Sequence, residues 1–318
     1  MTSASRNFGR WATAVIWLTL PVLAGPVFAN ALNPRSPAFQ HTATIGLWAF
    51  WAIGLVAALV PSTVSLTAIR ILAPSSLAVT GWAVLAAEER ADTAASLALA
   101  ITSLAAVVAL SAFVGDRFVN GSAYGDERRM PLRAPAALLL GPLELTWLAV
   151  VGGICAGPLL LAARIWIPGG VMLIIGWAAA AIGVRALHGL SQRWLVFVPA
   201  GMVVVDRMVL TDALLVQRQR IVALEIVKPA ALAPTTTGTD TDTGTDSGTD
   251  TDTDTDLTAG ALGPRLRVAL TTPELIVPAA SRLRRSEPIE PYEVSAVLVV
   301  PSRPGWALAE ARSRRLIA

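Results

Sequence analysis

Two ionisable residues inside long apolar runs are the first candidates for chemistry in this 318-residue chain. Arg70 lies in the run Val64–Ala87, and Glu144 lies in the run Ala134–Ala162. A charged side chain at the centre of a bilayer costs about 2.5–3.5 kcal/mol on insertion scales and often marks an ion or proton pathway. An Arg70–Glu144 ion pair between two helices would support a transporter or channel component. The alternative is that both side chains extend to the membrane surface from the ends of their runs.

Two adjacent carboxylates, Asp126 and Glu127, lie in the polar segment Gly115–Pro135 and suggest acid–base or metal chemistry. Carboxylates that share one face of a helix are three or four residues apart, not adjacent. The same segment holds four arginines and no histidine. We therefore predict a solvated loop that sets membrane topology. A membrane enzyme that acts on lipid through Asp126 and Glu127 is a third hypothesis.

Residues that metal sites and many enzymes require are scarce. The chain has two histidines, His41 and His188, one cysteine, Cys155, and one lysine, Lys228. These cannot build a zinc site or a phosphate-binding glycine loop followed by lysine. No Gly-x-Ser-x-Gly motif is present, and no basic patch alternates with aromatic residues as nucleic-acid binding would favour. We therefore predict a non-enzymatic protein with no catalytic, cofactor-binding or metal-binding residue and no nucleic-acid partner.

The segment Thr235–Asp256 contains seven aspartates, and its other residues are only Thr, Ser and Gly. Such a composition cannot bury enough apolar surface to order the backbone, so we predict a disordered loop over residues 229–260. Secreted calcium repeats need Gly-Gly-x-Gly-x-Asp with an apolar position, which Thr-Asp dipeptides lack. A cation site is thus less favoured than an expanded, tolerated loop. A third hypothesis is that the negative charges cover a basic surface of the same domain.

The elements that would carry these residues are mostly membrane helices. The chain is 54% hydrophobic and only 15% charged, against about 25% charged in soluble domains. Its apolar runs approach the roughly 20 residues that cross a bilayer. Six spans are predicted: Trp11–Phe28, Ile45–Val60, Val64–Ala87, Ala94–Val114, Ala134–Ala162 and Ile167–Ala186.

Two of the six spans have alternative interpretations. The first resembles a secretory signal with a cleavage site after Ala31, although its apolar stretch is longer than most signal cores. The third contains Arg70, Pro74 and two serines, so a short interfacial helix followed by a shorter span is an alternative. Gly153 and Gly157 in the fifth span have the small-residue spacing that allows close helix packing.

Arginine placement predicts the orientation of the spans. Nine arginines lie on the side of the N-terminus and three lie on the opposite side. The positive-inside rule then places both termini in the cytoplasm. The aromatic belt is only partly respected: Trp11, Trp48, Trp82 and Trp166 fall near span ends, whereas Trp17, Trp51, Trp147 and Trp177 lie deeper.

The pattern changes after His188 to short β-branched and aromatic runs separated by turn residues. Pro199-Ala200-Gly201 and Gln217–Arg220 separate the first pairs of strands, and a hairpin is predicted around Thr271-Thr272-Pro273. The segment beginning at Tyr292 favours a strand or the start of a helix. Ala307–Arg315 is a predicted closing helix, with Ser302 as its cap and Pro304 in its first turn.

This order of strands and a final helix resembles pleckstrin-homology-like (PH-like) domains in their bacterial, membrane-attached form. The whole chain resembles a family of uncharacterised multi-pass membrane proteins of actinobacteria, through "GDRFVNGSAYGDERRMPLRAPAALLLGPL", "RALHGLSQRWLVFVPAGMVVVD" and "SRPGWALAEARSRR". The resemblance covers most of residues 115–318 and carries no catalytic signature. The Thr-Asp tract departs from the family, in which this loop is shorter.

We therefore expect a mixed fold, with an α-helical transmembrane domain of about six spans over 1–190 and a small antiparallel β PH-like domain over 191–318. The expected function is that of a plasma-membrane protein whose cytoplasmic domain binds lipid headgroups or a protein partner. From Arg185 onwards there are 15 basic and 15 acidic residues, and seven of the acidic ones lie in the Thr-Asp tract. Without the tract the domain carries +7, which favours contact with an anionic leaflet.

Overall fold

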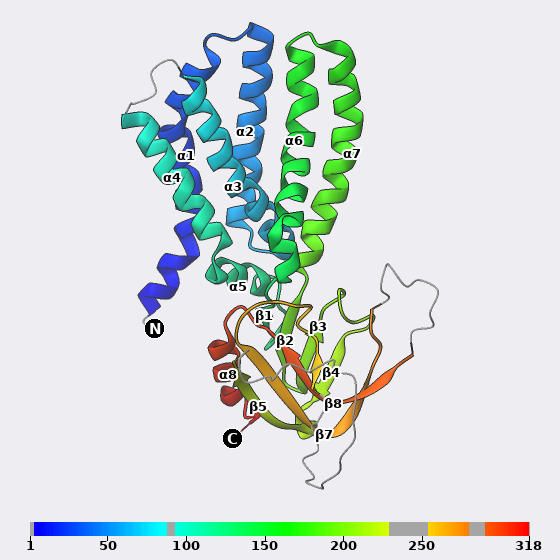
Figure 1. Ribbon diagram of the computed structural model, residues 1–318. Helices are drawn as coiled ribbons and strands as arrows, with labels where there is room; N and C mark the ends of the chain where they lie inside the picture. Colours follow the sequence, from blue (N-terminus) through cyan, green and yellow to red (C-terminus); the bar gives the residue numbers. More distant parts are fainter. Residues whose placement is uncertain (1–2, 88–92, 229–253, 280–289, 318) are drawn as a thin grey trace, which may run out of the picture. The chain divides into compact units, whose positions relative to one another are not determined.

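The computed structural model describes residues 3–87, 93–228, 254–279 and 290–317. The chain divides into two compact units (Figure 1). The helical unit comprises Met1–Ala123 and Leu139–Gln192, and the β unit comprises Tyr124–Leu138 and Arg193–Ala318. The sequence assigns Tyr124–Leu138 to the helical domain, but in the structure this segment belongs to the β unit because it supplies a strand.

Among the residues that the structure describes, six helices of the helical unit are long and apolar enough to cross a membrane, as a multi-pass membrane protein requires. The fifth span begins at Pro142 and not at Ala134, because Gly141, with φ of 131°, breaks the helix. The fourth ends at Leu110, since Ser111 caps a new short helix. The helices are α1 (Ser3–Leu32), α2 (Pro37–Leu59), α3 (Thr63–Ala86), α4 (Thr93–Leu110), α5 (Ala112–Asn120), α6 (Pro142–Ala162) and α7 (Trp166–Ser191), with a 3₁₀ turn, η1 (Ala136–Leu140), before α6.

Helix α3 lies at the centre of the helical unit and contacts each of its other six helices. It is one continuous helix through Pro74, so the alternative of an interfacial helix near Arg70 is not found. The hydroxyls of Ser75 and Ser76 donate to backbone carbonyls in the preceding turn. Its buried seam follows a spacing of three and four residues, and most of its members are small, which lets neighbouring helices approach closely. The seam is Leu66, Ile69, Ala73, Ser76, Thr80 and Ala83.

Helices α6 and α7 form a hairpin that packs through glycine. A Cβ on Gly153 would lie 2.2 Å from the carbonyl oxygen of Gly176, and a Cβ on Gly157 would lie 2.6 Å from Cα of Leu173. Both are far inside van der Waals contact, so the two backbones touch only because these positions are glycine. The predicted close packing at Gly153 and Gly157 is thus found between two helices of one chain. On α7 the contact is made by three glycines spaced seven residues apart, at positions 169, 176 and 183.

The four tryptophans that lie deep in the spans join helices together. The indole N–H of Trp17 donates to the carbonyl of Trp51, and that of Trp51 donates back to the carbonyl of Trp17. Trp147 on α6 donates to Ile71 on α3 at 3.1 Å, and Trp177 on α7 donates to α6. An indole N–H away from water needs an acceptor. These pairings explain why these tryptophans depart from the aromatic belt.

The β unit is built from two four-stranded sheets, in the orders β1-β2-β3-β4 and β5-β7-β8-β6. All pairs are antiparallel except β6 with β8. The turn before β3 requires glycine at Gly201, where φ is 153° and a Cβ would lie 2.1 Å from the carbonyl oxygen of Val216. The strands are β1 (Arg128–Pro131), β2 (Trp194–Val198), β3 (Gly201–Val205), β4 (Leu214–Gln217), β5 (Ile221–Val227), β6 (Thr255–Asp256), β7 (Arg265–Ile276) and β8 (Tyr292–Val299).

One apolar core lies between the sheets and under the final helix α8 (Pro304–Ser313). Large side chains fill it, including Phe197 from the first sheet, Leu266 from the second and Leu316 after α8. Two isolated β-bridges connect residues that follow strands of the two sheets. They join Leu132 with Pro301 and Leu210 with Pro278. The expected C-terminal β domain with a closing helix is therefore present.

Three details of the predicted β domain are corrected. No hairpin forms around Thr271-Thr272-Pro273, because β7 runs through them as one strand with a register shift against β8. Arg303, not Ser302, occupies the cap position of α8. The predicted disordered loop 229–260 ends too late: residues 229–253 lie outside the described residues, whereas Leu257 is buried and hydrogen-bonded to Leu298, which orders the chain there.

Candidate functional site

A buried ion pair lies at the point where the chain enters the β unit from α7. Arg193 donates through Nε and Nη2 to Oδ2 of Asp206, at 2.9 and 2.6 Å. The two side chains are 2% and 0% exposed. Arg193 also donates to the carbonyl of Arg133, while Asp206 accepts from the backbone of Met208. A buried pair whose hydrogen bonds are filled in this way positions the backbone and leaves little capacity for a ligand.

An open groove of about 300 Å³ lies between β1 and α8 of the β unit. Trp306 is its exposed aromatic wall, and Arg303 stacks its guanidinium 3.5 Å from the centre of the Trp306 ring. Glu310 at its edge is paired with Arg314 at 2.7 Å. The groove combines an aromatic face with both signs of charge, which suits a peptide or another polar chain. Its lining is Arg128, Met130, Trp306, Ala309, Glu310 and Ser313.

The two adjacent carboxylates Asp126 and Glu127 lie in different surroundings. Glu127 accepts two hydrogen bonds from Arg129, at 2.9 and 3.2 Å, and one from the backbone of Tyr124. The hydrogen bond from Arg129 holds the pKa of Glu127 below its usual range. Arg129 in turn lies 5.3 Å from the ring centre of Trp194. Glu127 therefore acts as an ionised anchor for Arg129, and Asp126 is exposed.

The last aspartates of the Thr-Asp tract pair with arginines of β7. Asp254 accepts from Nε of Arg267 at 2.9 Å, and Asp256 lies 3.6 Å from Arg265. Charge compensation between the tract and the domain is thus present at these two positions. The earlier aspartates lie outside the described residues, so the cation-site and tolerated-loop hypotheses stay predictions.

A polar chain links α3 to the end of α7 in the helical unit. Nδ1 of His188 lies 2.9 Å from Oγ1 of Thr67, which donates to the carbonyl of Thr63. Nε2 of His188 lies 2.9 Å from Nε2 of Gln192. If the Gln192 amide donates to Nε2 of His188, then the ring proton lies on Nδ1 and can be donated to Thr67. Each of the three hydrogen bonds then has one donor and one acceptor.

The predicted ion pair between Arg70 and Glu144 is not found. Neither side chain makes a hydrogen bond or ion pair with any residue that the structure describes. Arg70 is half-buried on α3, one turn after Thr67. Glu144 is exposed in the first turn of α6, where the positive end of the helix dipole stabilises a carboxylate. Arg70 and Glu144 therefore do not form one site, and the position of Glu144 at the start of α6 explains a carboxylate there.

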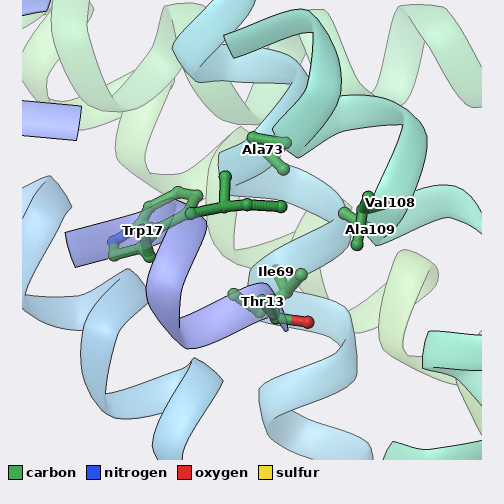
Figure 2. A pocket seen from close by; sticks show the side chains of 8 residues that line it. Thr13, Trp17, Ile69, Ala73, Val108 and Ala109 are labelled. Atoms are coloured by element: carbon green, nitrogen blue, oxygen red, sulfur yellow. The ribbon is translucent and has the colours of Figure 1, made fainter. Parts of the chain in front are cut away.

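A hollow between α1, α3 and α4 is too narrow to hold a water molecule. Figure 2 shows Thr13 and Trp17 of α1 facing Ile69 and Ala73 of α3 and Ala109 of α4. The hydroxyl of Thr13 is buried and has no hydrogen-bond partner in the described part of the chain. The hollow is therefore an imperfection of helix packing and offers no space for a substrate.

Within residues 3–87, 93–228, 254–279 and 290–317, no three metal-ligating side chains cluster. No protein-family model, curated protein or solved structure matches the chain. In the sequence analysis Arg193 counts only as a positive charge that indicates membrane orientation, and its pairing with Asp206 is not predicted. The predicted hairpin implies this pairing, because the register of Trp194 with Val205 places Arg193 opposite Asp206 at the next position.

Proposed function

We propose that the chain is a non-enzymatic integral membrane protein whose β unit is an interaction module, in contact with the lipid surface and with a protein partner. The observation that carries the proposal is the groove between β1 and α8, with its exposed Trp306 beside Arg128 and Glu310. Exposed aromatic and arginine side chains are the residues that most often dominate binding energy at protein interfaces.

A PH-like fold is part of this proposal. It is supported by two mostly antiparallel sheets around one core, joined along the chain by β4 and β5 and closed by a C-terminal helix. The departure from a simple domain is that β1 precedes the α6–α7 hairpin and pairs with β2, which follows it. The module is therefore connected to helices of the helical unit at three points: before β1, after β1 and before β2. These connections keep it at the membrane.

The proposed location is the cytoplasmic face of the plasma membrane. Because Tyr124–Leu138 and Arg193–Ala318 build one unit, the α6–α7 hairpin between them must return to the side from which it starts. The excess of arginines, nine against three, supports a cytoplasmic location for that side by the positive-inside rule. Cysteine accessibility at Asp126→Cys in intact cells tests this, in a Cys155→Ala background. Labelling by a membrane-impermeant reagent before lysis would contradict it.

Site-specific photo-cross-linking in the full-length chain tests the groove. A photoreactive amino acid at Ala309, exposed in the groove, should form a discrete adduct with one protein in native membranes. The same amino acid at Leu215, an exposed position on β4, is the control. The adduct at 309 should be lost when Trp306→Ala is added. Equal adducts at both positions, or none at 309, would overturn the proposal.

The test requires the full chain. A fragment over Arg193–Ala318, which the sequence-based boundary suggests, would lack β1 and the carbonyl of Arg133 that Arg193 binds. The fragment would therefore expose one edge of β2, and the buried guanidinium of Arg193 would lose one of its hydrogen-bond acceptors. Failure of that fragment to bind would say nothing about the module.

A transporter or channel component is the second candidate. It is favoured by the guanidinium of Arg70 on the central helix α3, which pairs with no residue in the described part of the chain. An arginine within a span without a protein partner is available to an anion or a lipid phosphate. Flux measurements in vesicles should then fall with Arg70→Ala and change little with Glu144→Gln, since Glu144 lies at the helix start. Unchanged flux with Arg70→Ala removes this candidate.

A further inference from the structure

One end of the β unit, here called the tether end, gathers the residues that adjoin the α6–α7 hairpin in the chain. The backbone N–H of Leu132 donates to the carbonyl of Arg193, which directly follows the cap of α7. The backbone of Arg133 donates to Val300, and that of Ala136 donates to Gly260. From Ala136 the chain reaches the first residue of α6 after only six residues. The tether end is thus fixed by covalent connection to two membrane helices.

The loop of residues 257–263 forms part of the tether end, because the carbonyl of Gly260 accepts from Ala136. Leu257, Thr258 and Ala261 are buried and hold the loop to the core. The hydroxyl of Thr258 accepts from Gly260 N–H, and its carbonyl accepts from Ala261 N–H. Leu262 is the large apolar residue of the loop that lies at the surface, with 70% of its area exposed. The loop is thus held to the core by three residues and presents one large apolar side chain at its surface.

An exposed arginine lies against the same leucine. Nη1 of Arg133 donates to the carbonyl of Leu262, and a Cβ on Gly263 would lie 2.7 Å from this nitrogen. The glycine therefore makes room for the guanidinium beside the leucine. An apolar side chain next to an arginine is the combination found at a membrane surface, where one enters the acyl boundary and the other meets headgroups.

We propose that the 257–263 loop is a membrane-contact element, in which Leu262 enters the acyl boundary of the bilayer and Arg133 binds lipid phosphates beside it. This inference rests on the proposed function, of which it names the lipid-contacting surface. The occupant is the bilayer that holds α6 and α7, because the segment that binds Gly260 and Leu262 continues directly into α6. A protein partner at this position would have to fit beside that segment.

Fluorescence quenching in the full-length protein tests the inference. In a Cys155→Ala background, Leu262→Cys carries an environment-sensitive dye, and the chain is reconstituted into phosphatidylcholine–phosphatidylglycerol vesicles. Lipid with a nitroxide on its acyl chain should remove most of the emission at position 262. The matched control is Leu275→Cys, because Leu275 is 61% exposed near the other end of β7. Emission at position 275 should not change.

The arginine is tested separately with Arg133→Gln, which keeps a donor in place of the guanidinium. Quenching at position 262 should then lose its dependence on the fraction of phosphatidylglycerol. Equal quenching at positions 262 and 275 would overturn the inference, and so would a blue-shifted but unquenched dye at 262, which would indicate a protein cover. These outcomes are independent of the cross-link at position 309, so failure here leaves the proposed groove standing and the reverse also holds.

Discussion

The β unit buries its large apolar side chains, whereas the helical unit exposes many of its own. In the β unit, Phe197, Met202 and Leu266 are fully buried between the sheets. In the helical unit each of the six spans exposes large apolar residues, such as Ile174 at 75%, and much of the contact between helices is made by small ones. Ala73 and Ala83 of α3 and Gly153 of α6 are examples.

This difference follows from the solvent that each unit meets. In water, burying apolar area stabilises the fold by about 25 cal/mol per Å². Between lipid and helix there is no such gain, so close packing and interhelical hydrogen bonds hold the helices together. The β unit should therefore be sensitive to loss of volume and of buried charge partners. The helical unit should be sensitive to added volume and to loss of indole N–H donors.

The largest expected effect is at the buried ion pair of the β unit. Asp206→Ala leaves the guanidinium of Arg193 buried without its partner, which should lower the free energy of unfolding by about 3–5 kcal/mol. Pulse proteolysis of the detergent-purified chain across a urea series measures it. Glu310→Ala, which breaks a more exposed pair, should cost less than about 1 kcal/mol. Equal effects of the two variants would contradict this role.

The next effect compares equal losses of volume in the two units. Leu266→Ala should destabilise the β unit by about 2–5 kcal/mol, since the side chain is fully buried. Ile174→Ala removes a side chain of the same size from an exposed position of α7 and should change stability by less than about 0.5 kcal/mol. Urea unfolding reports the first, and thermal loss of folded monomer in detergent reports the second. A large loss at position 174 would mean that this face is not lipid-exposed.

Added volume reverses the order of sensitivity. Gly153→Ala should destabilise the α6–α7 hairpin by about 1–3 kcal/mol, because its Cβ would lie 2.2 Å from a backbone oxygen that cannot rotate away. The neighbouring Gly152→Ala meets nothing within 4 Å and should be neutral or stabilising by up to about 1 kcal/mol. The thermal midpoint of the helical unit distinguishes them. A midpoint unchanged by Gly153→Ala would rule out the close glycine contact.

A smaller effect is expected when an indole donor is removed. Trp147→Phe loses the hydrogen bond to Ile71 and should cost about 0.5–1.5 kcal/mol of helical-unit stability. Trp82→Phe is the control, since Trp82 lies near a span end and is 41% exposed. Thermal midpoints of the two variants should therefore differ. The same shift in both would assign the loss to ring volume and not to the N–H.

The smallest effect is the pH dependence of the Glu127–Arg129 pair. The lowered pKa of Glu127 means that its stabilising contribution is present above the unfolded pKa and disappears as pH falls through the folded pKa. Glu127→Gln should therefore lower stability by less than about 1 kcal/mol at neutral pH and by nothing in acid well below 4.5. Urea series at the two pH values measure this. A difference that grows in acid would reverse the sign and contradict the assignment.

Much of the architecture was predictable because it has a local signature. Long apolar runs predict the spans. Short runs of β-branched and aromatic residues predict β2, β3, β4 and β5, with their separations at Pro199-Ala200-Gly201 and Gln217–Arg220. The final helix was predicted from Pro304 and the residues after it. The apolar run before Pro142 was misassigned to a span because composition there does not register the break at Gly141.

Other features had no local signature. β1 is only four residues, two of them arginines, and it is a strand because β2 pairs with it from beyond the α6–α7 hairpin. The segment over Thr271-Thr272-Pro273 has turn residues, yet pairing on both sides of it with β8 keeps β7 extended. The candidate sites followed the same rule: Arg70 and Glu144 stand out by composition, whereas the groove between β1 and α8 joins residues more than 170 positions apart.

Composition and periodicity are properties of neighbouring residues, so they indicate whether a segment meets lipid or water. The sequence therefore specified six apolar spans, a polar β region and the absence of the common catalytic motifs. Contacts between residues that are far apart in the chain become visible only in the folded protein. The strand β1 in the β unit, the Arg193–Asp206 pair and the glycine contact between α6 and α7 all depend on packing between segments remote in sequence. Such contacts are selected by the shape and charge of both partners at once, which neither segment carries alone.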